Sequence, residues 1–448
     1  MMFNAHDVKI FRFISYAYDE KKAVATFEYA FDNGPHFVEQ LIFNGVNKDL
    51  GHDERAALDI CLQNLCLILG ISYYKAAAPG EIRIEGFDIS PATAHFFETL
   101  YVNGLSEYSY RNGIDLRGRV KFPYVSHCKP NASSIELPRR TAVPIGGGKD
   151  SIVTLEILKS YGEPIVLFSL GDFKPIKNVI DKANLPSFTV SRKISPKLIE
   201  INSQGALNGH VPISAIIAFI LPLASLLYGF DVATLSNERS ANIGNLEHNG
   251  IKVNHQYSKS YDFEKRLSEY LRTSVLANFK YFSFLRPLSE LAIARIFTRF
   301  TSHDSIFTSC NRSFKITGTL SDQRWCLGCP KCLSTFLMLA PFMKKERLLS
   351  IFGYNILNDP LHAKEYDELI GVFGHKPFDC VGTDEEHLAA FCLLSNNADW
   401  ESDFLVKRFS EKILPKINNP EQLISAALTA SAEHLLPPHF EKILNAYL

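Results

Sequence analysis

The chain has 448 residues, of which 46% are hydrophobic and 21% are charged, as in an ordinary globular protein. Its 47 basic and 48 acidic side chains give a net charge of −1, which argues against an extended nucleic-acid-binding surface. The first residues lack the charged-then-apolar pattern of a signal peptide, and the nine cysteines then indicate a reducing compartment. We therefore expect a soluble, cytoplasmic protein of two or three domains that binds neither nucleic acid nor membrane.

Residues 1–135 are expected to form an N-terminal α+β domain. This region contains strand-like alternation in "AVATFEYAF" (23–31) and a helical pattern in "ERAALDICLQNLCLILG" (54–70). A polar stretch rich in Pro, Asn and Ser, "HCKPNASSIELPRR" (127–140), follows and is typical of a linker.

The pattern changes near residue 141 to strands that alternate with helices. Strands are predicted at 141–145, 164–170, 187–193 and 231–237, with a helix at 150–162. Apolar strands separated by helices indicate an α/β fold with a parallel sheet that is covered on both faces. We assign this second domain to residues 136–345, and a mainly helical C-terminal domain to residues 346–448.

The uncharged stretch "VPISAIIAFILPLASLLYGF" (211–230) is long enough to be considered as a membrane span. It carries Pro212 and Pro222, however, and leads directly into a predicted strand. A buried helix of the α/β domain, with Pro212 in its first turn, explains the stretch better.

The glycine-rich sequence "VPIGGGKDS" (143–151) lies between a predicted strand and a predicted helix. Successive glycines let backbone N–H groups turn toward an anion, and the helix adds the positive end of its dipole. Lys149 would add a point charge and Ser151 a hydroxyl donor. A simple strand-to-helix turn is the alternative, but the sequence favours a phosphate site.

This sequence resembles the S-G-G-x-D-S loop of the PP-loop ATP pyrophosphatases, with Gly146 in place of the usual Ser. The resemblance implies a doubly wound parallel sheet of the PP-loop or HUP type and an adenylating enzyme that splits Mg-ATP into AMP and pyrophosphate. It implies that Gly147, Gly148, Lys149 and Ser151 hold the departing pyrophosphate. Asp150 would order the loop or a magnesium ion.

Four cysteines form a second motif: Cys310, Cys326, Cys329 and Cys332. The last three are separated by two residues each, so one tight turn can present three thiolates to one ion, with Cys310 as a fourth ligand. Four sulfurs suit a structural zinc, an iron–sulfur cluster is the main competitor, and free thiols are the third possibility. The spacing also resembles that of PP-loop enzymes that make 7-cyano-7-deazaguanine, which carry a structural zinc.

Five further stretches together resemble the bacterial MurL-type epimerases over nearly the whole chain. They are "GISYYKA" (70–76), "LSNERSANIGN" (235–245), "VNHQYSKS" (253–260), "RWCLGCPKCLSTFLMLAPFM" (324–343) and "KPFDCVGT" (376–383). The resemblance implies that the terminal L-glutamate of UDP-N-acetylmuramoyl-L-Ala-L-Glu is inverted to D-glutamate for peptidoglycan synthesis. It also implies an acyl-adenylate intermediate, and a functional link to a muramoyl-L-alanine L-glutamate ligase.

That chemistry is physically reasonable. An α-proton beside an ionised carboxylate is barely acidic, because its removal builds a second negative charge next to the first. Transfer of AMP to the carboxylate removes that charge, after which a base can take the proton and an acid can return one from the other face.

Within that scheme, the sequence "SNERS" (236–240) follows a predicted strand, so Glu238 and Arg239 would lie at the strand end where ligands bind. Glu238 would hold magnesium and Arg239 would clamp a substrate carboxylate, unless both lie in a solvated loop. His255, with Lys259 nearby, is a candidate base or phosphate contact, and a purely structural histidine is the alternative. Cys380 is a candidate acid or base thiol, or an inert core cysteine.

Two functions outside this family stay open. One is a PP-loop enzyme that modifies a nucleobase, either a deazapurine nitrile synthase or a tRNA thiolase. The other is a zinc-stabilised scaffold that senses ATP without turning it over. Release of pyrophosphate would separate the scaffold from the enzymes.

Overall fold

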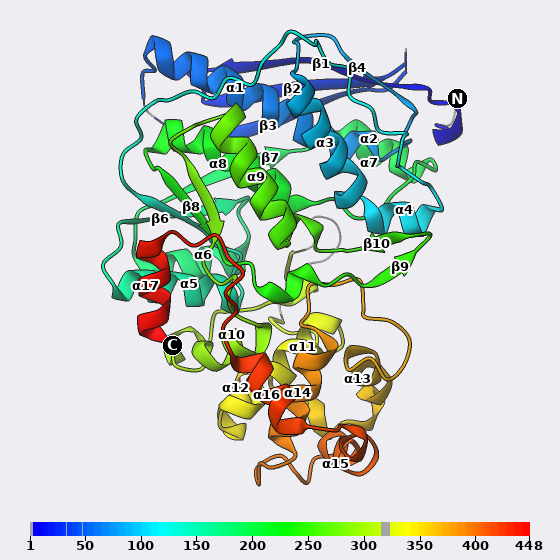
Figure 1. The fold of residues 1–448 in the computed structure, drawn as a ribbon, viewed down its shortest axis with the longest axis vertical. Helices are drawn as coiled ribbons and strands as arrows, with labels where there is room; N and C mark the ends of the chain where they lie inside the picture. Colours follow the sequence, from blue (N-terminus) through cyan, green and yellow to red (C-terminus); the bar gives the residue numbers. More distant parts are fainter. Residues whose placement is uncertain (1–2, 33, 47, 315–322) are drawn as a thin grey trace.

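The computed structural model describes residues 3–32, 34–46, 48–314 and 323–448. Within them, nine strands form one sheet in the order β11-β8-β5-β6-β7-β3-β2-β1-β4 (Figure 1). The strands are β1 (Ile10–Asp19), β2 (Val24–Phe31), β3 (His36–Phe43), β4 (Glu81–Ile84), β5 (Thr141–Pro144), β6 (Ile165–Leu170), β7 (Ser187–Lys193), β8 (Val232–Leu235) and β11 (Lys280–Ser283). A separate hairpin pairs β9 (Leu246–His248) with β10 (Ile251–Val253).

Strands β11, β8, β5, β6 and β7 run parallel to one another. Along the chain, β6 and β7 extend the sheet on one side of β5, whereas β8 and β11 extend it on the other. The strand order therefore reverses between β5 and β8, and ligands of open α/β sheets bind at such a point, outside the carboxyl ends of the strands. The α/β class with a mostly parallel sheet is confirmed, and the PP-loop type of fold stays a prediction.

The parallel strands are buried on both faces. Because successive side chains point to opposite sides of the sheet, each strand contributes to two hydrophobic cores. On β5, Ala142 belongs to one hydrophobic core and Val143 to the other. On β6, Val166 and Phe168 face the first core, whereas Leu167 faces the second. This alternation explains why these strands are nearly continuous apolar runs in the sequence.

The N-terminal strands continue the same sheet, because β3 pairs antiparallel with β7. Strands β1 and β2 follow in antiparallel order, and β4 closes the edge parallel to β1. Side chains of β3 alternate between buried and exposed, as expected when one sheet face meets solvent. The division of the chain into three domains stays a prediction.

Helices cover both faces of the sheet and build the C-terminal part. Up to the last strand they are α1 (His52–Leu69), α2 (Ile71–Tyr74), α3 (Pro91–Gly104), α4 (Ser106–Asn112), α5 (Lys149–Ser160), α6 (Lys174–Ala183), α7 (Pro196–Ser203), α8 (Ile213–Tyr228) and α9 (Tyr261–Ser274). After it they are α10 (Glu290–Phe297), α11 (Pro330–Leu339), α12 (Lys345–Phe352), α13 (Ala363–Leu369), α14 (Asp384–Leu394), α15 (Phe404–Lys412), α16 (Pro420–Leu428) and α17 (Pro438–Tyr447). The predicted mainly helical region after residue 345 is confirmed, and its last helix returns to pack on α5 (Figure 1).

The apolar stretch considered as a membrane span forms the buried helix α8, which packs against α1. Pro212 is its N-cap, so the predicted core helix is confirmed. Among the described residues, one stretch, His52–Tyr74, is long and apolar enough to cross a membrane by composition, and 78% of its most apolar window is buried inside the protein.

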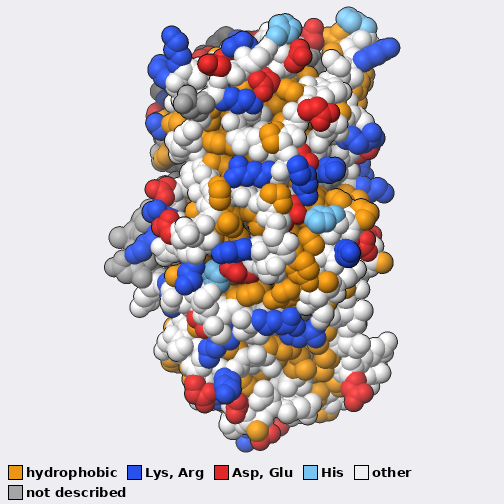
Figure 2. All heavy atoms as spheres, turned by 90° about the vertical axis from the view of Figure 1, so that its left-hand side faces the viewer, with side chains coloured by type: hydrophobic (Ala, Val, Ile, Leu, Met, Phe, Trp, Pro, Cys, Tyr) orange, Lys and Arg blue, Asp and Glu red, His pale blue; other side chains and the backbone are white. Residues whose placement is uncertain are grey.

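Basic and acidic side chains are mixed across the face shown in Figure 2. This mixture agrees with the net charge of −1. On that face, no surface of a single sign is visible among the described residues.

A fully buried ion pair joins α9 to the segment after β11. The Arg286 guanidinium donates to the Glu264 carboxylate at 2.7 and 3.1 Å, and both side chains are at most 1% exposed. Arg286 also donates to the carbonyls of Glu238, at 2.6 Å, and Lys259, at 2.5 Å. The pair therefore holds together two loops that carry candidate site residues.

Replacing Arg286 with Met would leave the Glu264 carboxylate buried without its charged partner, with the Ser283 N–H still donating to it. We expect Arg286→Met to lower the free energy of unfolding by about 3–5 kcal/mol, measured by urea denaturation. The matched control is Arg272→Met, which removes the partner of Glu269 in an exposed pair and should cost less than about 1 kcal/mol. Equal losses for the two variants would contradict the positioning role of Arg286.

Candidate functional site

A cavity of about 660 Å³ lies at the carboxyl ends of β5 and β8, where the strand order reverses. Its walls come from segments far apart in the sequence: the glycine loop, the end of β8, the loop with His255 and Lys259, the segment 308–311, Lys331 and the loop 378–380. Several sequence-predicted candidates therefore share one cavity.

The glycine loop leads from β5 into α5. Gly147 has φ of +79°, a conformation that L side chains rarely adopt, and a Cβ on Gly148 would lie 2.8 Å from the Ser309 Oγ. A Cβ on Gly146 would meet nothing within 4 Å, so the cavity leaves room at this position. The Ser151 hydroxyl donates to the Gly148 carbonyl and accepts from the Gly146 N–H, which orders the loop. Since no side chain caps α5, its N-terminal N–H groups are available to an anion.

Lys149 is not among the residues that line this cavity. Its side chain is 1% exposed, and its ammonium contacts the Asp150 carboxylate and lies 3.0 Å from a Glu290 oxygen. Burial would lower the pKa of Lys149, but these two carboxylates raise it. Lys149 therefore stays charged, and its predicted contact with pyrophosphate stays a prediction.

Three carboxylates converge next to the loop. Oxygens of Asp150, Glu238 and Glu290 all lie within 4.8 Å of one another. Lys149 contacts Asp150 and Glu290, but the three carboxylates keep an excess of negative charge, which a divalent cation would neutralise. Carboxylate oxygens are the ligands that Mg²⁺ prefers, so the donor set fits that ion.

Arg239 is another candidate that does not line the cavity. Its guanidinium donates to the main-chain carbonyls of Thr429, at 2.8 Å, and of Ala426 and Ala427, at 2.7 and 3.3 Å. These contacts attach the segment after β8 to the end of α16. A role for Arg239 as a carboxylate clamp stays a prediction.

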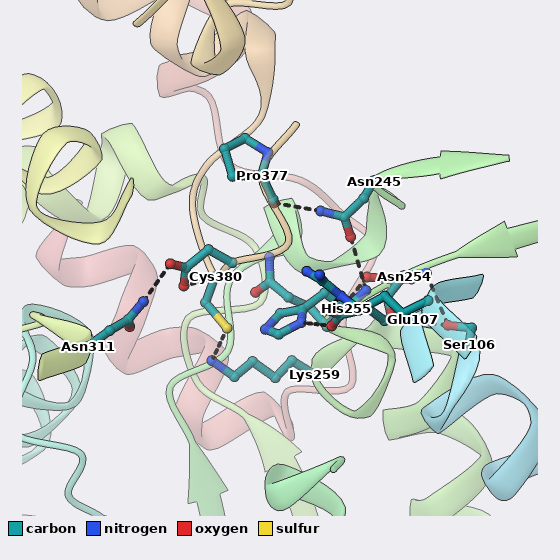
Figure 3. Close-up of polar contacts among 12 residues, drawn as sticks. Ser106, Glu107, Asn245, Asn254, His255, Lys259, Asn311, Pro377 and Cys380 are labelled. Atoms are coloured by element: carbon teal, nitrogen blue, oxygen red, sulfur yellow. Dashed lines mark hydrogen bonds and ion pairs between the residues drawn. The ribbon is translucent and has the colours of Figure 1, made fainter. Parts of the chain in front are cut away.

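Cys380 and Lys259 point toward each other on the opposite side of the cavity, with the His255 ring beside them (Figure 3). The Lys259 ammonium donates to the Cys380 sulfur at 3.3 Å. His255 interacts with Cys380 and uses its Nδ1 for a short hydrogen bond to the buried Glu107 carboxylate. The centroid of the His210 ring lies 4.2 Å from that of His255, with the two rings tilted by 48°.

These contacts set the protonation states of the cluster. Burial would raise the pKa of Cys380, but the positive charges of Lys259, His255 and Lys331 lower it to about 7. Burial would lower the pKa of His255, but Cys380 and Glu107 raise it to about 9. At neutral pH the cluster therefore contains a substantial fraction of thiolate beside an imidazolium.

The ligand atoms of Glu107, His210 and His255 also lie within 4.8 Å of one another, a distance at which they could hold a metal ion. However, the direct hydrogen bond between His255 and Glu107 already satisfies these two groups. The arrangement is that of an imidazole oriented by a carboxylate.

The four cysteines predicted to bind metal are brought together. Their sulfurs lie within 4.8 Å of one another, with 3.5 Å between Cys329 and Cys332 and 3.8 Å between Cys326 and Cys332. A tetrahedron of thiolates at the usual Zn–S distance has edges of about 3.8 Å, so the donor set fits zinc. Cys310 joins from a distant turn although part of the intervening segment, 315–322, lies outside the described residues.

The cysteine cluster is attached to the cavity wall on two sides. Lys331, between Cys329 and Cys332, lines the cavity at the start of α11. Asn311, next to Cys310, donates to the Asp379 carboxylate at 2.6 Å, and Asp379 accepts from the Cys380 N–H. Burial would lower the pKa of Lys331, but Glu290, Cys380 and nearby aspartates raise it.

Sequence analysis did not single out three residues of this site. Glu107 and Glu290 lie in segments without any recognisable motif, so no sequence signal pointed to them. Lys331 had a signal, because a residue enclosed between two cysteine ligands is held rigidly in place.

Comparisons with known proteins cover nearly the whole chain. A family model for the MurL N-terminal domain matches residues 2–284, and one for the MurL C-terminal domain matches residues 306–423. Relatives named UDP-N-acetyl-alpha-D-muramoyl-L-alanyl-L-glutamate epimerase include one from Xanthomonas oryzae pv. oryzae (strain MAFF 311018), 41% identical over 97% of both chains. Those from Salinispora tropica (37% identical) and Micromonospora sp. (36% identical) also cover 97% of this chain, matching 95% and 97% of their own lengths.

The cysteine cluster predicts about one thiolate-bound metal ion per chain, which elemental analysis by mass spectrometry would count. Cys329→Ser should reduce the count to near zero, whereas Cys128→Ser, at a partly exposed cysteine outside the cluster, should leave it unchanged. Visible absorption distinguishes an iron–sulfur cluster from colourless zinc. Purified protein with no bound metal at all would contradict the assignment.

The contacts of Cys380 predict that it reacts at a lower pH than a free thiol, because the thiolate is the reactive form. Its alkylation by iodoacetamide, followed by peptide mass spectrometry, should accelerate with a midpoint of about pH 7. Lys259→Met removes the nearest positive charge and should move the midpoint upward. A wild-type midpoint near that of a free thiol, about 8.5, would contradict the charge arrangement.

Proposed function

The chain belongs to the MurL family of epimerases, and from this premise we propose that it inverts the terminal L-glutamate of UDP-N-acetylmuramoyl-L-Ala-L-Glu. The chain is thus an isomerase. The proposal extends to an ATP-dependent mechanism in which the glutamate carboxylate is adenylated, with release of pyrophosphate and then AMP. The product, carrying D-glutamate, would serve peptidoglycan synthesis.

One observation carries the mechanism: the glycine loop and the Cys380–Lys259–His255 cluster line the same cavity. The loop offers backbone N–H groups to phosphate at the positive end of α5. The cluster offers groups that exchange protons near neutral pH. An epimerase that first activates a carboxylate and then moves the neighbouring proton needs both within the length of one substrate.

In the first half-reaction, groups of the protein would bind the negatively charged phosphates of ATP. Backbone N–H groups of Gly147 and Gly148 would receive the phosphates, with the open position at Gly146 facing the cavity. Asp150, Glu238 and Glu290 would hold Mg²⁺, which neutralises phosphate charge when bound. Lys149 would keep these carboxylates together. Carboxylate attack on the α-phosphate then produces acyl-adenylate and pyrophosphate.

In the second half-reaction the proton on the α-carbon is exchanged. Adenylation removes the negative charge of the carboxylate, so the α-proton becomes more acidic. The group that takes it would belong to the cluster, where Lys259 and His255 both interact with the Cys380 sulfur. Return of a proton to the other face inverts the centre, and hydrolysis makes the sequence effectively irreversible.

The proposal includes two supporting parts. Cys310, Cys326, Cys329 and Cys332 would hold a structural zinc that fixes the wall carrying Lys331. A ligase that adds L-glutamate to muramoyl-L-alanine would supply the substrate in the cytoplasm. Neither nucleic acid nor a membrane is required.

The test is a reaction in deuterated water with ATP, Mg²⁺ and UDP-N-acetylmuramoyl-L-Ala-L-Glu. We expect AMP, pyrophosphate and D-glutamate carrying solvent deuterium at its α-carbon. Gly147→Ala, which forces a side chain into the left-handed region, should lower all three signals about 100-fold. Gly146→Ser places its side chain in open space and is the matched control.

Protein that binds ATP but forms neither AMP nor D-glutamate would sink the proposal. A deazapurine acid and tRNA, supplied in parallel reactions, would then distinguish the nucleobase-modifying alternative from a scaffold without turnover.

A further inference from the structure

Cys380 lies in the wall of the cavity where the activated glutamate would form. A thiolate next to an activated acyl group is a competent nucleophile as well as a base. We propose that Cys380 takes the acyl group from the adenylate and that the glutamate centre is inverted while it is held as a thioester. This inference rests on the proposed function and adds a covalent intermediate to it.

The surroundings of Cys380 match those of an activated nucleophile. Lys259 donates to its sulfur at 3.3 Å, and Lys331 adds a second positive charge on the cavity wall. His255 interacts with the sulfur, and Glu107 orients the ring through Nδ1. A nucleophile, an adjacent histidine and a carboxylate behind it form the arrangement found in covalent catalysis.

The backbone also fixes Cys380 in the cavity wall. Its N–H donates to the Asp379 carboxylate at 2.8 Å, and Asn311 holds the other oxygen of that carboxylate. Two residues later, a Cβ on Gly382 would lie 2.7 Å from Met338 and 2.8 Å from Glu386, so this loop lies tightly against α11 and α14. A fixed nucleophile keeps the acyl carbon at a defined place.

The steps balance without any additional reactant. An electron pair of the Cys380 sulfur attacks the acyl carbon, the C–S bond forms, and the C–O bond to phosphate breaks with its electrons on AMP. A base removes the α-proton, and a proton returns to the opposite face. Water then attacks the thioester, the C–S bond breaks, and the thiolate is restored as the acid product leaves.

Acylation also changes the charge state of His255. The thiolate is one of the two groups that hold the imidazole in its protonated form, and the thioester is neutral. The pKa of His255 therefore falls once the acyl group is on sulfur. The ring then becomes a better base at the moment when the α-proton has to be removed.

The variant Cys380→Ala distinguishes the two roles of Cys380, nucleophile or proton carrier, because they predict different rates of AMP release. If Cys380 accepts the acyl group, the variant should still release a burst of pyrophosphate, whereas AMP release and D-glutamate formation should both fall about 100-fold or more. If Cys380 only moves a proton, the adenylate should still hydrolyse, and AMP should appear at a near-normal rate together with unchanged L-glutamate. That second result would overturn the inference.

The thioester can also be detected directly by mass spectrometry. Wild-type protein mixed with Mg-ATP and substrate in a single turnover, quenched in acid and digested, should carry the acyl mass on the Cys380 peptide. Hydroxylamine should remove this acyl mass from the peptide. The control variant Cys128→Ser should carry the same acyl mass on Cys380 as the wild type. Unchanged thermal stability and ATP binding establish that Cys380→Ala is folded. Absence of pyrophosphate from wild-type protein would instead contradict the proposed function itself.

Discussion

The ion pair between Arg286 and Glu264 is the interaction on which the geometry of the cavity depends. A buried guanidinium needs all its donors satisfied, and this one reaches the carbonyls of Glu238 and Lys259 as well as its carboxylate partner. Glu238 follows β8, and Lys259 precedes α9. A single side chain therefore fixes the distance between a carboxylate of the acidic cluster and a lysine of the thiolate cluster.

The cysteine cluster has a comparable positioning effect on the other wall. It has no place in the chemistry of adenylation or proton transfer, yet Lys331 and Asn311 are each next to one of its sulfurs in the sequence. Asn311 leads to Asp379 and from there to the Cys380 N–H. A metal that closes the cluster would thus stabilise both a cation of the cavity and the loop that carries the thiolate.

The parallel strands and the helix after the glycine loop could be predicted from the sequence because both depend on local signals. The strand at 187–193 has the predicted bounds, and the helix α5 begins one residue before the predicted start. The direction of Lys149 could not be predicted in this way, since it depends on Glu290, a residue 141 positions away on α10. Likewise, the environment of His255 depends on Glu107, which joins it from α4. Electrostatic partners from distant segments leave no periodicity or spacing in the sequence.

The placement of charge in the cavity explains why two lysines face the thiolate while Lys149 turns inward. The acidic cluster already needs Lys149 as its internal cation, because three converging carboxylates repel one another. The charges of Glu290 and Asp150, and also those of Cys380 and Asp379, raise the pKa of Lys331, so this lysine interacts with both anionic centres. Lys331 thereby favours the thiolate of Cys380 while it also interacts with the carboxylates of Asp150 and Glu290. Without a cation there, each anionic centre would raise the pKa of the other, and the thiol would lose the charge that its reactivity requires.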